Sequence, residues 1–200
     1  MYFFGASGHG KVIVEIAEEL NETIDGFLDA DVTKTHVFSY PVLHEVPQDS
    51  IEVVFSLGNN AIRKKLSKQF NHFQYKTLIH PKTTISKRTS IGEGTVVMAG
   101  VTMNSEAQVG KHCIINTNAS IDHECVINDF VHISPNVALA GNVEIGEGTH
   151  VGIGATVIQG IKIGKWCTIG AGTVVIRDVP DYAVVVGNPG KVIKYTNEKL

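Results

Sequence analysis

The eighteen residues 109–126 read VGKHCI, INTNAS and IDHECV, three hexapeptides that each begin with an aliphatic side chain. The same phase continues in both directions without a slip, and every sixth residue is aliphatic or methionine: Ile79, Ile85, Ile91, Val97, Met103, Val109, Ile115, Ile121, Ile127, Ile133, Leu139, Ile145, Val151, Val157, Ile163, Ile169 and Val175. A period of six fits neither an α-helix nor a simple amphipathic strand. It predicts a solenoid in which three short strands form a coil of about 18 residues around the aliphatic column.

Two further columns accompany the aliphatic one. The residue that follows each aliphatic position is often Gly, Asn, Asp or Ser, which are residue types that tolerate a tight turn. The residue four positions after it is small or β-branched. Cys113, Cys125 and Cys167 occupy this column, so we expect them to be small apolar core residues rather than nucleophiles or metal ligands.

The hexapeptide pattern is typical of left-handed parallel β-helices, an exception to the usual right-handed crossover. Residues 77–200 are therefore predicted to form a left-handed β-helix with a C-terminal tail. Residues 1–76 are predicted to form a small α/β domain, Rossmann-like with βαβαβ order, so that the fold class is mixed. The expected elements are strands at Tyr2–Phe4, Thr23–Leu28 and Ile51–Leu57, a helix over Lys11–Leu20 that buries Val12, Ile13, Ile16, Ala17 and Leu20, and a second helix that ends at Phe70.

Charge and composition narrow the possible functions. The formal net charge is −3 and no basic tract is present, so we expect no nucleic-acid partner. No apolar run approaches the roughly 20 residues of a membrane span, and no basic leader precedes Gly5, so we expect no membrane partner. Three cysteines without a CxxC spacing favour a cytoplasmic location.

A glycine-rich loop, Gly5-Ala6-Ser7-Gly8-His9-Gly10, lies between the first predicted strand and helix. Such a loop can bring backbone N–H groups and a helix N-terminus to a phosphate. Its GxxGxG spacing is compatible with NAD, with Asp25 as the acid for the ribose, but the domain is too small for the second half of a dinucleotide fold. A nucleotide mono- or diphosphate, which could carry a sugar, fits better, and a turn without a ligand is the remaining alternative.

His123 is the candidate catalytic residue. It lies two positions after the inward Ile121 and should point outward, and Gly141 follows one coil later, directly above it. An imidazole can remove a proton from an amine or hydroxyl that attacks a thioester, and the Gly141 N–H can stabilise the oxyanion. Glu124 can orient the imidazole ring. A solvated surface histidine is the competing interpretation.

The chain resembles the hexapeptide-repeat nucleotide-sugar acyltransferases, which include sialic-acid O-acetyltransferases and N-acetyltransferases of UDP-4-amino-sugars. The resemblance covers nearly the whole chain and rests on the order of these stretches: Gly5–Gly10, Gly26–Asp31, Leu57–Arg63, Leu78–Pro81, His123–Ile127, Ala140–Val143 and Val186–Pro189. It implies an acetyl-CoA-dependent enzyme, without a metal, that works as a homotrimer with its sites at subunit interfaces.

The resemblance also implies roles for individual residues. His123 matches the general base of the family, Glu124 its carboxylate partner and Gly141 the oxyanion donor. The residues expected to bind the nucleotide sugar are Gly8, His9, Gly10, Asp29, Ala30, Asp31, Gly58, Asn59, Asn60 and Asn116. The residues expected to contact acetyl-CoA are His132, Gly141, Ala155, Gly170, Gly172 and Lys191, although Lys191 is equally compatible with a solvated lysine.

Competing functions remain open at this point. The γ-type carbonic anhydrases use the same fold with histidines around zinc, but His112, His123, His132 and His150 lack the close pair of that family. A trimerising spacer with an attached nucleotide sensor would need no catalytic His123. Within the acetyltransferase interpretation, a UDP- or dTDP-linked 4-amino-deoxysugar is the first choice of acceptor, and O-acetylation of a sialic acid or related sugar is the alternative.

Overall fold

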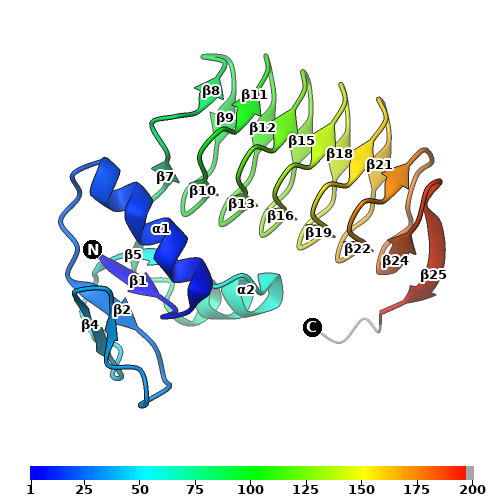
Figure 1. Cartoon of the computed structure of the whole chain (residues 1–200). Coiled ribbons are helices and arrows are strands. Elements are labelled where there is room, and N and C mark those ends of the chain that lie inside the picture. Colours follow the sequence, from blue (N-terminus) through cyan, green and yellow to red (C-terminus); the bar gives the residue numbers. More distant parts are fainter. Residues whose placement is uncertain (197–200) are drawn as a thin grey trace.

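The computed structural model describes residues 1–196 of the chain. A small α/β unit lies beside the first coils of a left-handed parallel β-helix, and the described chain ends at the opposite end of the helix (Figure 1). The predicted fold class, a Rossmann-like α/β unit followed by a left-handed β-helix, is thus confirmed.

The α/β unit contains one six-stranded sheet with the order β3-β4-β2-β1-β5-β6. Its elements are β1 (Tyr2–Phe4), α1 (Gly8–Glu19), β2 (Gly26–Leu28), β3 (His36–Val37), β4 (Tyr40–Leu43), β5 (Glu52–Phe55), α2 (Asn60–Gln69) and β6 (Gln74–Tyr75). The pairs among β4, β2, β1, β5 and β6 are parallel, whereas β3 and β4 are antiparallel. The sequence analysis missed β3, β4 and β6, which are too short to show a period of two.

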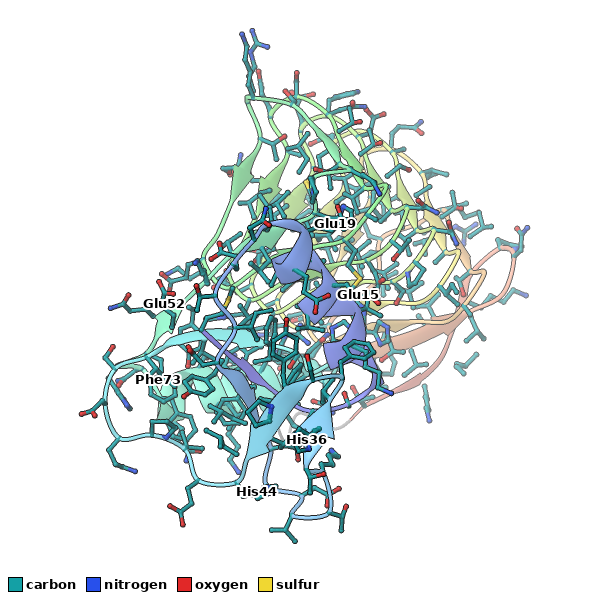
Figure 2. All side chains as sticks on the ribbon, turned by 60° about the vertical axis from the view of Figure 1, so that its left-hand side comes forward. Glu15, Glu19, His36, His44, Glu52 and Phe73 are labelled. Atoms are coloured by element: carbon teal, nitrogen blue, oxygen red, sulfur yellow. The ribbon has the colours of Figure 1, made fainter. Side chains whose placement is uncertain are left out.

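Helix α1 differs from its prediction in two ways. It begins at Gly8, three residues earlier than expected, so the second half of the glycine-rich loop is already helical. Val12 and Leu20 were expected to be buried, which is wrong, because they are 43% and 37% exposed. The buried face is instead rotated and is formed by Gly10, Ile13, Val14, Ile16 and Ala17, while Glu15 and Glu19 lie on the outer face of the helix (Figure 2).

The β-helix consists of two-residue strands that recur every six residues. They are β7 (Leu78–Ile79), β8 (Thr84–Ile85), β9 (Ser90–Ile91), β10 (Val96–Val97), β11 (Thr102–Met103), β12 (Gln108–Val109), β13 (Ile114–Ile115), β14 (Ser120–Ile121), β15 (Val126–Ile127), β16 (His132–Ile133), β17 (Ala138–Leu139), β18 (Glu144–Ile145), β19 (His150–Val151), β20 (Thr156–Val157), β21 (Lys162–Ile163), β22 (Thr168–Ile169) and β23 (Val174–Val175). Each strand pairs in parallel with the strand 18 residues later, for example Ile115 with Ile133, so the coils stack in register.

The stacked strands form a prism with three faces. The first face carries β7, β10, β13, β16, β19 and β22, the second carries β8, β11, β14, β17, β20 and β23, and the third carries β9, β12, β15, β18 and β21. The first face continues into β24 (Ala183–Val186) and then β25 (Lys191–Tyr195), which runs antiparallel to β24 and ends the sheet.

The interior of the prism is filled by the two columns that the sequence predicts. The aliphatic column from Val97 to Val175 is buried, with at most 5% exposure at any of its positions. Cys113, Cys125 and Cys167 are buried free thiols in the second column, as predicted. Burial raises the pKa of the Cys113 thiol to about 12, which keeps it protonated and unreactive.

One column of outward side chains runs along the first face, from Leu78 to Thr168, and we call it the wall. The α/β unit covers one half of the wall and leaves the other half open. Leu78, Val96 and Ile114 are at most 1% exposed and pack in one apolar cluster with Phe3 and Ile13 of the α/β unit. The next three positions of the wall, in the same register, are polar: His132, His150 and Thr168. The open half of the wall is therefore available to a ligand.

Two side chains of α2 fasten the α/β unit to the β-helix. Arg63 is 1% exposed, and it donates hydrogen bonds to the carbonyl oxygens of Leu57 (3.0 Å), His112 (3.0 Å) and Phe130 (3.0 Å). Asn60 donates from Nδ2 to the Gly148 carbonyl oxygen at 2.9 Å. These bonds span the boundary between the two parts and fix their relative orientation.

Candidate active site

His123 lies on the corner between the second and third faces, where its imidazole is 56% exposed. Its Nδ1 is 2.9 Å from Glu124 Oε2, and its backbone N–H donates to Asp122 Oδ1 at 2.8 Å. The hydrogen bond that Nδ1 donates to the Glu124 carboxylate, together with the charge of Asp122, raises the pKa of the imidazole. Because Glu124 engages Nδ1, Nε2 is left toward solvent as the atom that can exchange a proton.

Gly141 lies directly against this imidazole. A Cβ atom added to Gly141 would stand 2.6 Å from both Cε1 and Nε2 of His123, so the ring occupies the space that a side chain would take. The neighbouring Asn142 N–H donates to the His123 carbonyl oxygen at 2.8 Å. The Gly141 N–H, in contrast, has no backbone acceptor among the described residues. A base and an unpaired backbone donor thus lie side by side.

A second polar cluster occupies the open half of the wall. Asn116 Nδ2 is 3.3 Å from His132 Nε2, and the rings of His132 and His150 are stacked with centroids 4.7 Å apart. His150 Nε2 is 2.8 Å from Ser134 Oγ. Burial, followed by the neighbouring His150, lowers the pKa of His132 to about 2, so His132 is a neutral ring. His132 Nδ1 is buried without a hydrogen-bond partner among the described residues.

The two clusters lie on different sides of the same prism. His123 and Gly141 stand on the corner that joins the second and third faces, whereas Asn116, His132 and His150 belong to the first face. In a triangular prism, a corner between two faces is opposite the third face. One chain therefore does not bring Asn116 and His132 together with His123.

The glycine-rich loop is held by Asp29. Its Oδ2 accepts the Ala6 N–H at 2.8 Å and the Lys34 ammonium at 2.8 Å, and its Oδ1 accepts the Asp31 N–H at 3.0 Å. Partial burial acts to raise the pKa of Asp29, but the hydrogen bonds from Lys34, Asp31 and Ala6 outweigh it and lower the pKa. Ala30 and Asp31 are exposed beside this carboxylate.

The N-terminus of α1 is open. Its N-cap residue Ser7 makes no side-chain cap, and Gly8 is exposed with no heavy atom within 4 Å of an added Cβ. His9 is partly buried, and its ring lies 6.1 Å from that of His132, so it connects the loop to the wall. Gly10, however, is buried, and a Cβ there would stand 2.8 Å from the Gly5 carbonyl oxygen, so it serves helix–strand packing rather than a ligand.

The predicted Gly58-Asn59-Asn60 turn has mixed roles. Gly58 and Asn59 are exposed, and Asn59 Oδ1 caps α2 by accepting the Ile62 N–H at 3.0 Å. Asn60 is buried; its Nδ2 donates to the Gly148 carbonyl oxygen of the β-helix, whereas its Oδ1 has no hydrogen-bond partner among the described residues. A cavity of about 300 Å³ beside the turn brings Gly58 and Asn59 to His150 and Thr168 of the wall.

The residues expected to contact acetyl-CoA do not form one group. Gly170 lines a cavity of about 460 Å³ that it shares with Asn116, His132 and His150. Its N–H already donates to the Val185 carbonyl oxygen at 2.8 Å. The Ala155 side chain is 0% exposed inside the prism, so only its backbone can contact a ligand. Gly172 and Lys191 are exposed toward the C-terminal end of the first face.

Two residues that the sequence analysis did not select are central to this geometry. His150 lies 18 residues after His132, and that spacing alone could have placed it in the same column. Arg63 joins the two parts of the chain, and nothing in its local sequence signals burial. Within residues 1–196, no three His, Cys, Asp or Glu side chains are grouped so that they could hold a metal ion. None of the described helices is both long and apolar enough to span a membrane.

Comparisons with known proteins agree with this geometry. The PglD N-terminal domain family matches residues 1–70, and the bacterial transferase hexapeptide (six repeats) family matches residues 142–177. A mutant form of perosamine N-acetyltransferase from Caulobacter crescentus, in complex with CoA and GDP-perosamine, superimposes with a TM-score of 0.92 at 36% identity over 96% of both chains. The acetyltransferase domain of PglB from Neisseria gonorrhoeae FA1090, in complex with acetyl coenzyme A, gives a TM-score of 0.89 at 37% identity over 96% of this chain and 98% of that chain.

A curated relative gives a shorter match. UDP-N-acetylbacillosamine N-acetyltransferase from Bacillus subtilis (strain 168) is 40% identical over 106 residues, which cover 48% of this chain and about half, 49%, of that protein. A β-helix of hexapeptides that presents an imidazole beside a carboxylate defines the class of the protein, the hexapeptide-repeat acyltransferases. Because solved relatives match at 36–37% identity over 96% of its length, the chain belongs to the nucleotide-sugar acyltransferase family of that class.

Proposed function

We propose that the protein is an acetyl-CoA-dependent N-acetyltransferase that acts on the amino group of a nucleotide-linked 4-amino-deoxysugar. The observation that carries the proposal is the His123 imidazole, hydrogen-bonded to Glu124 and packed against Gly141. The relatives support the choice of substrates, since one is named for UDP-N-acetylbacillosamine and others were solved with GDP-perosamine, CoA or acetyl coenzyme A. O-acetylation of a sialic acid or related sugar is the second candidate, because a histidine base can serve a hydroxyl equally well.

The proposed reaction uses few protein groups. The amine attacks the thioester carbonyl carbon and a C–N bond forms, while His123 Nε2 accepts the proton that the amine loses. The oxyanion that develops is stabilised by the Gly141 N–H. When the C–S bond breaks, the imidazolium returns its proton to the CoA thiolate. Glu124 keeps the proton of the neutral ring on Nδ1, and it stabilises the imidazolium between these two transfers.

We further propose that residues 1–76 bind the nucleotide sugar and residues 77–200 carry out the transfer. The N-terminus of α1 offers N–H groups without a side-chain cap and the positive end of its dipole, which favour a diphosphate. Asp29 holds the loop that leads to this terminus. A sugar that extends from there past His9 would reach the polar half of the wall.

A sugar on the wall is on the wrong side of the prism for His123 of the same chain. We therefore propose a homotrimer in which the wall of one subunit faces the His123 corner of its neighbour, with acetyl-CoA in the groove between them. Closed cyclic symmetry repeats this contact three times, so that every wall and every His123 corner in the trimer has a partner.

The function is tested by release of free thiol from acetyl-CoA with a panel of UDP-, dTDP- and GDP-linked 4-amino-sugars and with sialic acid. We expect turnover with at least one amino sugar, and a loss of about 10²–10⁴-fold in kcat for His123→Ala. Because Glu124 raises the pKa of His123, Glu124→Gln should move the acidic limb of the kcat profile to lower pH. Turnover close to wild type in His123→Ala would remove this histidine as the base.

The shared site is tested by co-expressing two inactive variants with different tags. Gly8→Phe blocks the open N-terminus of α1 without a core clash, and His123→Ala removes the base. In random trimers, about a quarter of the sites formed between two chains contain neither substitution, so about a quarter of the activity should return. If each site lay within one chain, the mixture would stay inactive.

A further inference from the structure

One corner of the prism, between the third and first faces, repeats a pattern of side chains. The residues in left-handed backbone conformation along it are Gly94, His112, Phe130, Gly148, Trp166 and Tyr182. Each N–H from His112 onward donates to a carbonyl oxygen of the preceding coil, at 2.8–2.9 Å, so the six residues form one column. The column therefore repeats the order glycine–aromatic–aromatic. We call Gly94, His112 and Phe130 the first aromatic step, and Gly148, Trp166 and Tyr182 the second aromatic step.

The first aromatic step is covered by the α/β unit. The His112 ring lies over Gly94, where an added Cβ would stand 2.3 Å from Nδ1, and it stacks on Phe130 with centroids 5.2 Å apart. Phe55 and Tyr75 pack against the same ring at 5.3 Å and 4.7 Å. The bulky side chains of this step are thus explained by the interface between the two parts of the chain.

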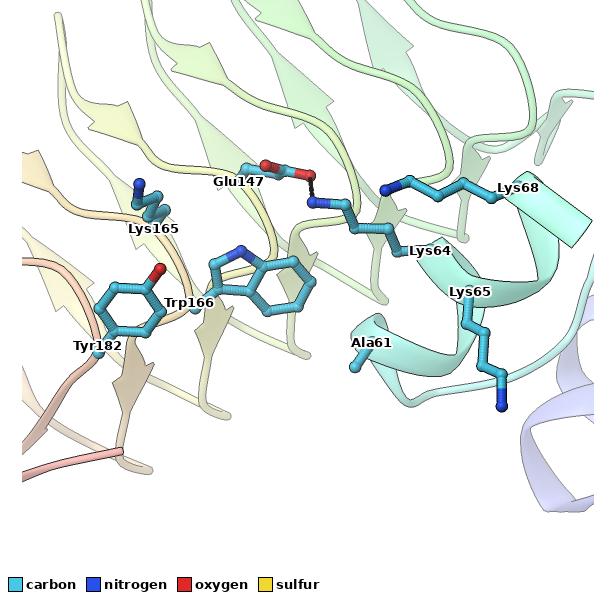
Figure 3. A pocket seen from close by; sticks show the side chains of 8 residues that line it. All are labelled: Ala61, Lys64, Lys65, Lys68, Glu147, Lys165, Trp166 and Tyr182. Atoms are coloured by element: carbon cyan, nitrogen blue, oxygen red, sulfur yellow. Dashed lines mark ion pairs between the residues drawn. The ribbon is translucent and has the colours of Figure 1, made fainter. Parts of the chain in front are cut away.

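The second aromatic step has the same local geometry without that cover. The Trp166 ring lies over Gly148, where an added Cβ would stand 2.4 Å from two ring carbons. Trp166 and Tyr182 are only partly buried, and they line an open cavity of about 430 Å³ (Figure 3). The opposite side of the cavity is formed by α2, which contributes Lys64, Lys65 and Lys68.

The cavity carries an excess of positive charge. Four lysines line it, but Glu147 is the only carboxylate among the lining residues that the structure describes. Lys64 forms an ion pair with Glu147, and its Nζ lies 5.1 Å from the centre of the Trp166 ring. Lys165 Nζ lies 5.9 Å from the centre of the Tyr182 ring. Figure 3 shows the side chains of Lys64 and Lys68 extending from α2 toward the β-helix, whereas Lys65 points away from both.

We propose that this cavity binds a nucleotide phosphate at a site separate from the sugar-nucleotide site proposed at the N-terminus of α1. Lys64 and Lys68 are one turn apart on α2, and Glu147 pairs with Lys64 only, so a phosphate between the two lysines would supply negative charge that the cavity lacks. The partly exposed ring of Tyr182 offers an apolar surface on which a planar base can stack, and Trp166 lines the same cavity. The volume lies within the range of about 300–1,000 Å³ that is usual for small-molecule sites. Two sources share this chemistry, a free nucleoside diphosphate and the 3′-phospho-ADP end of CoA.

Trp166 provides the measurement, because it is the only tryptophan in the chain. UDP and adenosine 3′,5′-bisphosphate, titrated separately into the intact protein with excitation at the red edge of indole absorption, should quench its fluorescence saturably. Inorganic pyrophosphate should reverse the quenching by competition. The nucleotide that binds more tightly identifies the source, and the absence of saturable quenching by both would overturn the proposal.

Variants decide where the nucleotide binds. Lys68→Glu, an exposed substitution that places a carboxylate next to Lys64, should weaken the affinity about tenfold or more. Lys87→Gln, an exposed lysine on the first coil, is the matched control and should bind as wild type. In Gly8→Phe, quenching should persist, since that variant blocks only the proposed sugar-nucleotide site. Equal affinity in Lys68→Glu and wild type, or loss of quenching in Gly8→Phe, would contradict a separate site, whatever the outcome of the acetyl-transfer assay.

Discussion

The two halves of the wall share one backbone but carry opposite chemistry. Both consist of two-residue strands in the same parallel register, from Val96 paired with Ile114 to His132 paired with His150. The first half presents Leu78, Val96 and Ile114 to the α/β unit, and the second presents imidazole and hydroxyl groups to an open surface. The backbone of the β-helix is therefore the same whichever side chains point outward. The type of outward side chain depends on whether the α/β unit covers that coil.

Because the two halves of the wall differ in what covers them, the covered half should contribute mainly to stability and the open half mainly to function. Apolar side chains in the covered half gain from removal of their surface from water. The histidines of the open half have no apolar partner among the described residues of the α/β unit, and under the proposed function they serve a ligand. Substitutions in the two halves should consequently affect different measurements, which gives three ways to test the comparison.

The largest expected effect comes from the contact that closes the covered half. Arg63→Met removes a buried guanidinium and leaves the carbonyl oxygens of His112 and Phe130 without its N–H donors, which should lower the free energy of unfolding by about 3–5 kcal/mol. Arg88→Met, at an exposed arginine, should change it by less than about 0.5 kcal/mol. Urea unfolding curves of the two variants give the comparison, and equal values would show that Arg63 does not hold the two parts together.

A smaller effect is expected from truncation of the wall itself. Ile114→Ala leaves a cavity under the α/β unit and should cost about 2–4 kcal/mol of unfolding free energy. Thr168→Ala, three coils later in the same column, should cost less than about 1 kcal/mol, since no protein element covers it. Thermal and urea unfolding measure both variants. A similar loss at Thr168 would mean that the open half also contributes to the folded core.

The smallest effect concerns pH at the border of the two halves. Burial, followed by the charge of Arg63, lowers the pKa of His9 to about 4, whereas an unfolded histidine titrates near about 6.5. As the pH falls from about 6.5 to about 4, the unfolded chain takes up a proton that the folded chain does not. Stability should therefore fall over this window, by up to about 1.4 kcal/mol per pH unit for this residue.

The pH effect can be assigned with two variants. His9→Gln should reduce the slope of unfolding free energy against pH between about 6.5 and about 4 by up to about 1.4 kcal/mol per pH unit, and the slope that remains comes from the other buried histidines, His112, His132 and His150. His36→Gln, at an exposed histidine of β3, should leave the curve as in wild type. An unchanged slope in His9→Gln would show that the ring titrates normally in the folded protein.

The sequence was most informative where structure depends on local repetition. The hexapeptide phase predicted the buried aliphatic column from Val97 to Val175, the inward cysteines and the stacking of Gly141 on His123, because strands in a regular coil have no freedom of register. In the α/β unit, by contrast, α1 began earlier and buried a different face from the one that its pattern indicated. Its contacts are set by the wall, which lies more than 60 residues away in the chain.

The candidate site was predictable only in part for the same reason. The identity of His123, Glu124 and Asp29 followed from motifs, but the separation of His123 from Asn116 and His132 required the three faces of the prism. The burial of Asn60 and Arg63 required knowledge of which coils the α/β unit covers. Contacts between elements that are distant in sequence carry no local signal, so short motifs could not assign these residues.

The antiparallel strand β25 has a consequence for how the molecule behaves in concentrated solution. A parallel β-helix ends in an unpaired strand edge that could accept the first coil of another molecule and start a fibre. On the first face that edge is occupied by β25, which runs in the opposite direction and exposes Lys191 and Lys194. An incoming parallel strand would meet reversed polarity and positive charge there, so β25 disfavours parallel end-to-end stacking on the first face.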